Sequence, residues 1–326
     1  MANDPFLDAD GTPRAGRSGG GRRVIRIAKW SLGLIVLVCL LYYPIGMLVV
    51  SKIDDDPNFK APNVPAGASQ SVALAAALIN REVNQNGWVS NDPFFLPGSM
   101  LDNMPNYQQG LMVAISRFVL ELQDQIGRSR ASSSIDTDLQ RALGLLKYSP
   151  TVWLWDPSVS LAPTASSETQ YRSGMRALES YNDRLSRGQA VFEPRADNLM
   201  VTLDGIGKDL GSATNDIDNQ IDQNSGNWLD FHADDVFYRT KGIAYAYALL
   251  LRDLGVDYKA VIQEKGAESI WQRLVGSLMD AAALRPWIVV NGRPDAQLQP
   301  NHLAAEGFYI QRARTQLYEM IDILQK

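Results

Sequence analysis

Cysteine and histidine are scarce in this sequence, whose 326 residues include one cysteine and two histidines. The cysteine, Cys39, lies inside a long apolar run, so no disulfide can form within one copy and no cysteine can ligate zinc outside that run. The histidines, His232 and His302, are far apart in the chain. The Gly-x-Ser-x-Gly motif of serine hydrolases is missing after the apolar run, and its one match, Gly16–Gly20, lies in the polar N-terminal tail. The catalytic residues therefore stay unknown, and we predict no cofactor.

Phosphate-binding motifs and basic patches are missing as well. The sequence contains neither a Gly-x-Gly-x-x-Gly motif nor a Gly-Lys-Ser/Thr loop. The net charge of −5 is uneven, because the chain up to Lys29 carries +3 and the remainder carries −8. Since nucleic-acid binding requires a basic surface, the acidic main body predicts that nucleic acid is not a partner.

One long stretch is wholly apolar. "WSLGLIVLVCLLYYPIGMLVV", from Trp30 to Val50, contains no charged residue. As a helix it would be about 31 Å long, which matches a bilayer hydrocarbon core of about 30 Å. We therefore predict that Trp30–Val50 contacts the lipid bilayer. Basic residues precede it and three aspartates follow it, which favours a cytoplasmic N-terminus and an outer body. A cleaved signal peptide is the weaker alternative, because its apolar region would be only about 7–15 residues long.

Composition divides the chain around this stretch. Residues 1–23 are rich in glycine, arginine and aspartate and predict a disordered cytoplasmic tail. Residues 24–51 form the predicted transmembrane helix. Residues 52–69 contain three prolines and predict a semi-extended spacer between membrane and body. Residues 70–326 form the predicted helical domain.

Helical periodicity dominates residues 70–326. Apolar residues recur every three or four positions in eight stretches, and only the run from Pro286 to Asn291 looks strand-like. The fold class expected is all-α, with an N-terminal transmembrane helix followed by a multi-helix bundle. A division into two subdomains near residues 156–166 is left open. The most regular apolar seam lies in residues 195–221, and we expect the preceding helix, residues 166–188, to cover it.

The segment from Asn86 to Gly110 interrupts the helical pattern with three prolines and four aromatic residues. Structureless loops longer than about 12–15 residues are uncommon and are usually functional or disordered. Disorder would leave its aromatic side chains in water, so we expect an ordered crossover packed onto the bundle and anchored by Trp88, Phe94, Phe95 and Leu96. A partner-binding surface built from the same groups is the alternative. Its candidate residues are Trp88, Phe94, Phe95, Asp102, Asn106 and Arg117.

Clusters of acids offer two weaker possibilities. The segment "DFHADD", residues 230–235, has side chains that hard cations use, but aspartates are also favoured at a helix N-terminus. Its spacing fits no closed site, so no metal site is predicted. Glu82, Glu121 and Glu168 are candidates for the general acid of a glycan hydrolase, although no pattern places two carboxylates about 5–10 Å apart.

The Asn86–Gly110 segment, with "RFVLELQDQIGRSR" and "DTDLQRAL" after it, resembles an uncharacterised family of proteobacterial single-span inner-membrane proteins with a periplasmic helical domain of unknown function. The resemblance runs from the apolar stretch to the C-terminus. It implies a single-pass protein of the cell inner membrane, with a cytoplasmic N-terminus and a periplasmic C-terminal domain, and it brings no activity. We therefore expect a membrane-anchored periplasmic scaffold or interaction protein, whose partner is an envelope protein or polymer. An envelope glycan (peptidoglycan) hydrolase is the alternative.

Overall fold

The structure, a computed structural model, describes residues 19–129, 136–155, 161–226, 230–293 and 296–326. Within these ranges it contains ten α-helices and no strand, which confirms the predicted all-α class with a long apolar helix at the N-terminus. The chain divides into two compact units, Met1–Gly46 and Met47–Lys326.

The first unit consists mainly of α1 (Gly19–Val50), whose last four residues belong to the second unit. The helix starts at Gly19, inside the segment predicted as a tail, and the predicted disorder of residues 1–18 lies outside the described residues. Its stretch Arg23–Val50 is long and apolar enough to cross a membrane, with a mean hydropathy of 2.5. A helix of this kind near the N-terminus fits a membrane anchor or a signal sequence.

The second unit contains the remaining nine helices, of which the sequence predicted all but the short α8. They are α2 (Gln70–Asn80), α3 (Asn103–Ser129), α4 (Thr137–Leu146), α5 (Ser167–Ser186), α6 (Ala196–Asn224), α7 (Ala233–Asp257), α8 (Lys259–Glu264), α9 (Glu268–Ala282) and α10 (His302–Gln325). A π-helical turn, Arg81–Gln85, extends α2, and a 3-10 turn, Pro97–Met100, precedes α3. The run predicted to be strand-like forms only an isolated bridge between Asn291 and Asn301.

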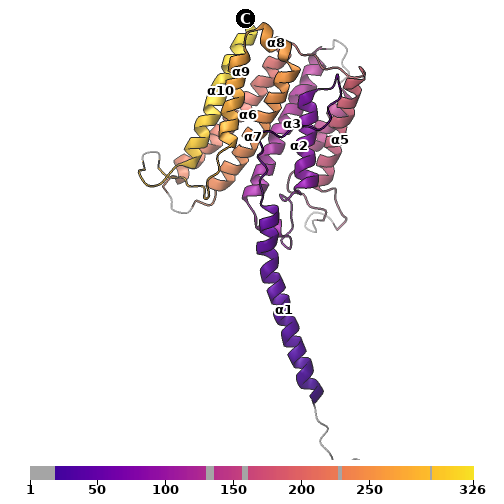
Figure 1. The fold of residues 1–326 in the computed structure, drawn as a ribbon, viewed down its shortest axis with the longest axis vertical. Helices are drawn as coiled ribbons and strands as arrows, with labels where there is room; N and C mark the ends of the chain where they lie inside the picture. Colours follow the sequence, from indigo (N-terminus) through magenta and orange to yellow (C-terminus); the bar gives the residue numbers. More distant parts are fainter. Residues whose placement is uncertain (1–18, 130–135, 156–160, 227–229, 294–295) are drawn as a thin grey trace, which may run out of the picture. The chain divides into compact units, whose positions relative to one another are not determined.

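The central helix of this unit is α7, which packs against α3 along its length (Figure 1). Helices α6, α9 and α10 lie on one side of this pair, and α2, α4 and α5 lie on the other. Two glycines allow the α3 and α7 backbones to approach closely. A Cβ on Gly242 would lie 2.1 Å from the Tyr107 carbonyl oxygen, and one on Gly110 would lie 2.0 Å from the Arg239 carbonyl oxygen.

The apolar seam of α6 is buried as expected, but its neighbours differ from the prediction. Its main contacts are with α10 and α3, rather than with the preceding helix α5. Helix α5 instead packs against α4 and α2. The connection between α5 and α6 therefore crosses the body, which periodicity alone cannot reveal. The whole of Met47–Lys326 forms one compact unit, so the division into two subdomains left open by the sequence is not observed.

Four connections lie at one end of this body, namely α2–α3, α4–α5, α6–α7 and α9–α10 (Figure 1). Hydrogen bonds link them in pairs. Asn91 Nδ2 donates to the Val152 carbonyl oxygen at 2.8 Å, which joins the first two connections. The Gly226 amide donates to the Asn291 carbonyl oxygen at 2.8 Å, which joins the last two. This end of the body, called the loop end below, holds most of the residues that the sequence singled out.

Candidate functional site

The α2–α3 loop is ordered by its buried base. Trp88 is 4% exposed, and its indole N–H donates to the Pro150 carbonyl oxygen at 2.9 Å. Its ring meets Tyr171 edge-on, with ring centroids 4.9 Å apart. Asn91 also donates to the Glu168 carboxylate at 2.8 Å. These contacts attach the loop to α5 and to the connection before it, so the loop has a fixed base.

The tip of the same loop is exposed. Phe94 is 83% exposed, Phe95 is 45% exposed and Met100 is 66% exposed. The two phenylalanine rings lie edge-on at 5.4 Å, and Phe95 lies edge-on to Trp153 at 5.5 Å. The expectation that Trp88 anchors the loop therefore agrees with its burial, whereas Phe94 is largely exposed and Phe95 is only half-buried; Asn91 supplies a further anchor. An apolar pair held outward on an ordered base is suited to contact with another molecule.

Asp102 and Asn106 lie where the loop enters α3. The Asp102 carboxylate accepts from the Asn103 amide at 2.8 Å. Asn106 Nδ2 donates to the Asp102 carbonyl oxygen at 3.0 Å and to the Asp235 carboxylate at 2.6 Å. Asn106 therefore joins α3 to α7.

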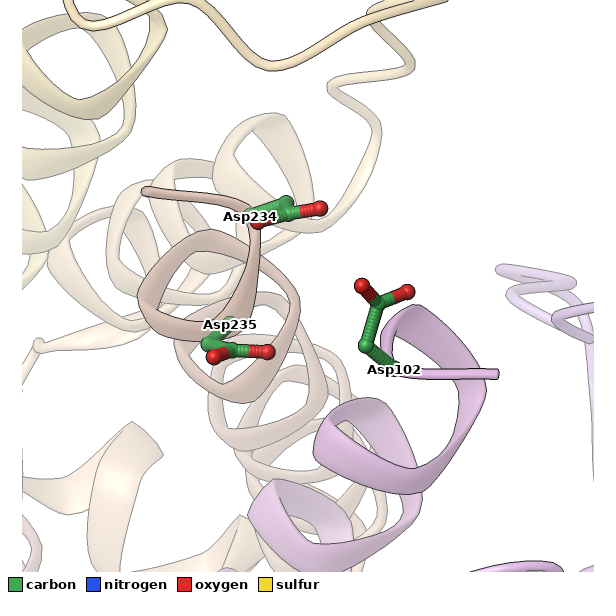
Figure 2. A group of neighbouring side chains, drawn as sticks. All are labelled: Asp102, Asp234 and Asp235. Atoms are coloured by element: carbon green, nitrogen blue, oxygen red, sulfur yellow. The ribbon is translucent and has the colours of Figure 1, made fainter. Parts of the chain in front are cut away.

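Three carboxylates meet at this junction, those of Asp102, Asp234 and Asp235 (Figure 2). They project from the N-terminal ends of α3 and α7 toward one another, and each offers an oxygen within 4.8 Å of the others. Burial and the charge of Asp102 raise the pKa of Asp234 above its ordinary value. His232 lies 3.4 Å from the Asp235 carboxylate.

These oxygens are of the kind that hold a hard cation such as Ca²⁺ or Mg²⁺. Each carboxylate also lies at a helix N-terminus, where the macrodipole and the free amides favour negative charge without any metal. The helix ends therefore account for the grouping by themselves, and it does not indicate a bound ion. The sequence had considered only the part of this group on α7, because Asp102 is distant in the chain.

Arg117 lies apart from the loop tip, in the middle of α3. Its guanidinium donates to Asp209 of α6 at 3.0 Å, and Asp209 also accepts from the Tyr247 hydroxyl at 2.7 Å. Arg117 lines a cavity of about 360 Å³ whose walls include Pro150 and Tyr171, the residues that hold Trp88. The structure thus brings Arg117 near the base of the loop, but it does not bring it to Phe94 or Phe95.

The three glutamates proposed as general acids have separate environments. Glu82 is fully buried; burial raises its pKa although Arg81, 2.9 Å away, opposes that shift. Glu121 is 7% exposed and lies 3.8 Å from Arg117. Glu168 accepts from Asn91. Burial and the negative charge of Glu168 raise the pKa of Asp92 to about 6, an interaction between distant residues that no sequence motif signals.

A cluster of ion pairs that sequence reasoning did not find holds the spacer. Asp55 is 8% exposed and pairs with the buried Nζ of Lys241 at 2.8 Å and with Arg285. Burial opposes the ionisation of Asp55, but the hydrogen bonds from Lys241 and Arg285 outweigh it and lower the pKa of the carboxyl. Burial lowers the pKa of Lys241, and Asp55 opposes that shift. These ion pairs with Lys241 and Arg285 hold the spacer against the helical body.

Further contacts bind the spacer backbone. The Tyr107 hydroxyl donates to the Asp54 carbonyl oxygen at 2.9 Å, and the Tyr245 hydroxyl donates to the Asp56 carbonyl oxygen at 2.8 Å. The Arg81 guanidinium lies over the Phe59 ring, 4.6 Å from its centroid. Residues 53–59 are thus bound along the helices and do not extend away from them. Proline content alone suggested an extended spacer, because it carries no information on these long-range partners.

The comparisons with known proteins give one match. A family described as "Uncharacterized protein conserved in bacteria (DUF2333)" matches residues 35–230 and 218–326, which together cover most of the chain. No curated protein and no solved structure matches. The expected resemblance to an uncharacterised bacterial family with one N-terminal apolar helix is thereby confirmed. The chain therefore belongs to the DUF2333 family of bacterial proteins.

Proposed function

We propose that this protein is a membrane-anchored scaffold or interaction protein of the bacterial cell envelope. Trp30–Val50 crosses the inner membrane once, the N-terminus lies in the cytoplasm, and the helical domain lies in the periplasm. The charge distribution around the apolar stretch supports this orientation.

The observation that carries the proposal is the α2–α3 loop, with its fixed base and exposed tip. Trp88 and Asn91 order the loop, while Phe94 and Phe95 stay accessible. Aromatic side chains held on a rigid base are typical anchors of protein–protein interfaces. We assign the loop tip to an envelope protein partner, with an envelope polymer as the other possible ligand. Asp102 and Asn106 lie at the foot of the same loop, and Arg117 lies beside the cavity behind it.

Site-specific crosslinking in cells tests this assignment. A photo-reactive amino acid at position 94 is compared with one at position 308, where a phenylalanine on α10 is 62% exposed. We expect a defined crosslinked partner from position 94 that is absent from position 308. Purification in mild detergent of the Phe94→Ala, Phe95→Ala double variant should then lose that partner, while Phe308→Ala keeps it. Equal recovery of the partner with both variants would remove the loop from the interaction.

The alternative function, an envelope glycan hydrolase, has one observation in its favour. Asp92 and Glu168 interact, and one of them has a raised pKa, as a general acid requires. It ranks second because Glu168 already accepts a hydrogen bond within the protein from Asn91. Incubation of the purified protein with peptidoglycan decides the question: release of soluble fragments that is abolished by Asp92→Asn would establish the hydrolase, and release of none would reject it.

A further inference from the structure

The α6–α7 and α9–α10 connections present four large apolar side chains to solvent. Phe231 is 73% exposed, Ile288 75%, Leu298 99% and Trp287 fully exposed. We call these four residues the apolar tips. Isolated exposed apolar residues are ordinary, but several large ones on adjoining loops mark a contact surface.

The apolar tips stand on a rigid base. Beneath them lies a small separate core of Ile217, Ala233, Phe237 and Leu303, each of them fully buried. Val289 packs against this core while its neighbour Ile288 is exposed, so the segment has a defined inner and outer side. Asn291 Nδ2 donates to the Asp230 carboxylate at 2.9 Å, which ties the two connections together. The exposure is therefore built into the fold.

The spacer reaches the body beside the apolar tips. Val50, the last residue of α1, packs against the main core of the body, as does Ile53. Asp55 pairs with Arg285, and Trp287 is two residues beyond Arg285. Lys52–Pro57 and Leu284–Pro286 line the two sides of one cavity. The C-terminal end of the apolar helix and the tips are thus at the same end of the body.

The spacer leaves no length of chain with which to lift this end from a bilayer. From Val50 to Asp55 a fully extended chain would span at most about 18 Å, and Val50 itself already contacts the body. At the opposite end, among the described residues, Val256 in the last turn of α7 is the one large apolar side chain that is exposed. The two ends of the body therefore differ in the way expected of a membrane-facing and a water-facing end.

We infer that the apolar tips insert into the interface of the bilayer that α1 crosses, so that the body lies on the membrane and contacts lipid at the tips as well as at the anchor. The inference rests on the proposed anchor. Trp287 suits it, because indole rings favour the membrane–water interface. Phe94 and Phe95 remain assigned to the partner, as proposed above for the α2–α3 loop.

Both signs of charge lie near the apolar tips along the chain. Arg285 and Arg293 are basic, whereas Asp230, Asp234 and Asp235 are acidic. Attraction to anionic lipid is therefore weak, and burial of apolar surface is the driving force. The tips should insert to the same extent in zwitterionic phosphatidylcholine bilayers as in anionic bilayers. Raising the salt concentration should not reduce this insertion.

Nitroxide depth measurements on the full chain in phosphatidylcholine nanodiscs test the inference. The native Cys39 is labelled first, because it lies within the span and reports whether α1 crosses the bilayer. In a Cys39→Ser background, labels are then placed by Leu298→Cys and by the matched control Val256→Cys. Both native side chains are exposed, at 99% and 58%, so neither substitution disturbs packing. Collision with oxygen reports lipid, and collision with a water-soluble nickel complex reports water.

We expect the label at 298 to collide at least several-fold more with oxygen, relative to nickel, than the label at 256. Equal, water-like values at both positions with Cys39 in lipid would overturn the inference and leave the anchor intact. A water-accessible Cys39 would reject the anchor, and with it the proposed function. If position 298 were exposed in nanodiscs but shielded in native membranes, the tips would contact a protein, which also overturns the inference.

Discussion

Substituting Asp55 by asparagine should release the spacer from the body. The change keeps the shape of the side chain and removes its charge, so Lys241 remains buried without its counter-ion. Lys241 is 2% exposed and Asp55 is 8% exposed, which makes this a buried ion pair. Loss of one partner from such a pair typically costs about 3–5 kcal/mol. Arg285 contributes less than about 1 kcal/mol, because its side chain is 68% exposed.

The loss cannot exceed the cost of deprotonating Lys241, because a neutral lysine no longer needs a counter-ion. At pH 7.5, removing a proton from a lysine of ordinary pKa 10.5 costs about 4 kcal/mol. The carbonyl oxygens of Ala282 and Leu284 also accept from Nζ and offset part of the loss. We therefore expect Asp55→Asn to lower the free energy of unfolding by about 2–4 kcal/mol at pH 7.5.

The pH dependence distinguishes this mechanism from a general loss of packing. Loss of Asp55 removes the interaction that raises the pKa of Lys241, so this pKa falls further in the folded variant. Above the pH at which the folded variant loses this proton, folding releases a proton. Stability should then rise with pH by up to about 1.4 kcal/mol per unit, and the deficit relative to the native protein should shrink accordingly.

Chemical unfolding of the full chain in detergent measures the loss, and hydrogen exchange over residues 53–59 measures release of the spacer. The matched control is Asp56→Asn, because Asp56 is exposed and its carboxylate accepts only from the nearby Asn58 amide. A deficit below 1 kcal/mol with unchanged exchange would refute the claim that Asp55 holds the spacer.

Three further predictions concern the stability of the body. Gly242→Ala should destabilise it by about 1–3 kcal/mol, because the added Cβ meets the α3 backbone. Gly276→Ala has open space around the added Cβ and should stabilise the body by up to about 1 kcal/mol. If thermal unfolding ranked the two variants the other way, it would contradict the close α3–α7 contact. Asp92→Asn should be more stable than the native protein at pH 7.5, and this advantage should fall as the pH drops from 6 toward 4, because the native carboxyl, with a pKa of about 6, becomes protonated when folded. Glu306 is fully buried, and burial raises its pKa well above 4.5. As the pH rises from 5 to 7, Glu306→Gln should therefore gain stability over the native protein by up to about 1.4 kcal/mol per pH unit. If the unfolding free energies of the two proteins changed with pH in parallel, Glu306 would be ionised in the fold.

The helices were predictable because their signals are local. Ser166 caps α5 as its position in the sequence suggests, and the seam residues from Leu199 to Ile217 are all buried on α6. Helix α8 was missed, since six residues are too few to show a helical period. The tertiary neighbour of the α6 seam was also missed, because periodicity gives the buried face of a helix and not what covers it.

The candidate site was predictable only in part, for the same reason. The aromatic content of the α2–α3 loop pointed to order, and Trp88 provides it. Exposure of Phe94 and Phe95 could not be read from the sequence, because all three aromatic residues look alike there. Asp55 and Lys241 pair although they are far apart in the sequence, so no motif connects them. Electrostatic sites assembled from distant residues need the fold before they can be seen.

The bound spacer has a consequence for where this protein can act. A free linker of about 18 residues would allow the domain to lie about 23 Å from its attachment point. With residues 53–59 held by α7 and its neighbours, that freedom is lost. If the proposed anchor holds, a ligand of the α2–α3 loop has to come to the membrane surface, which selects molecules that already reside there.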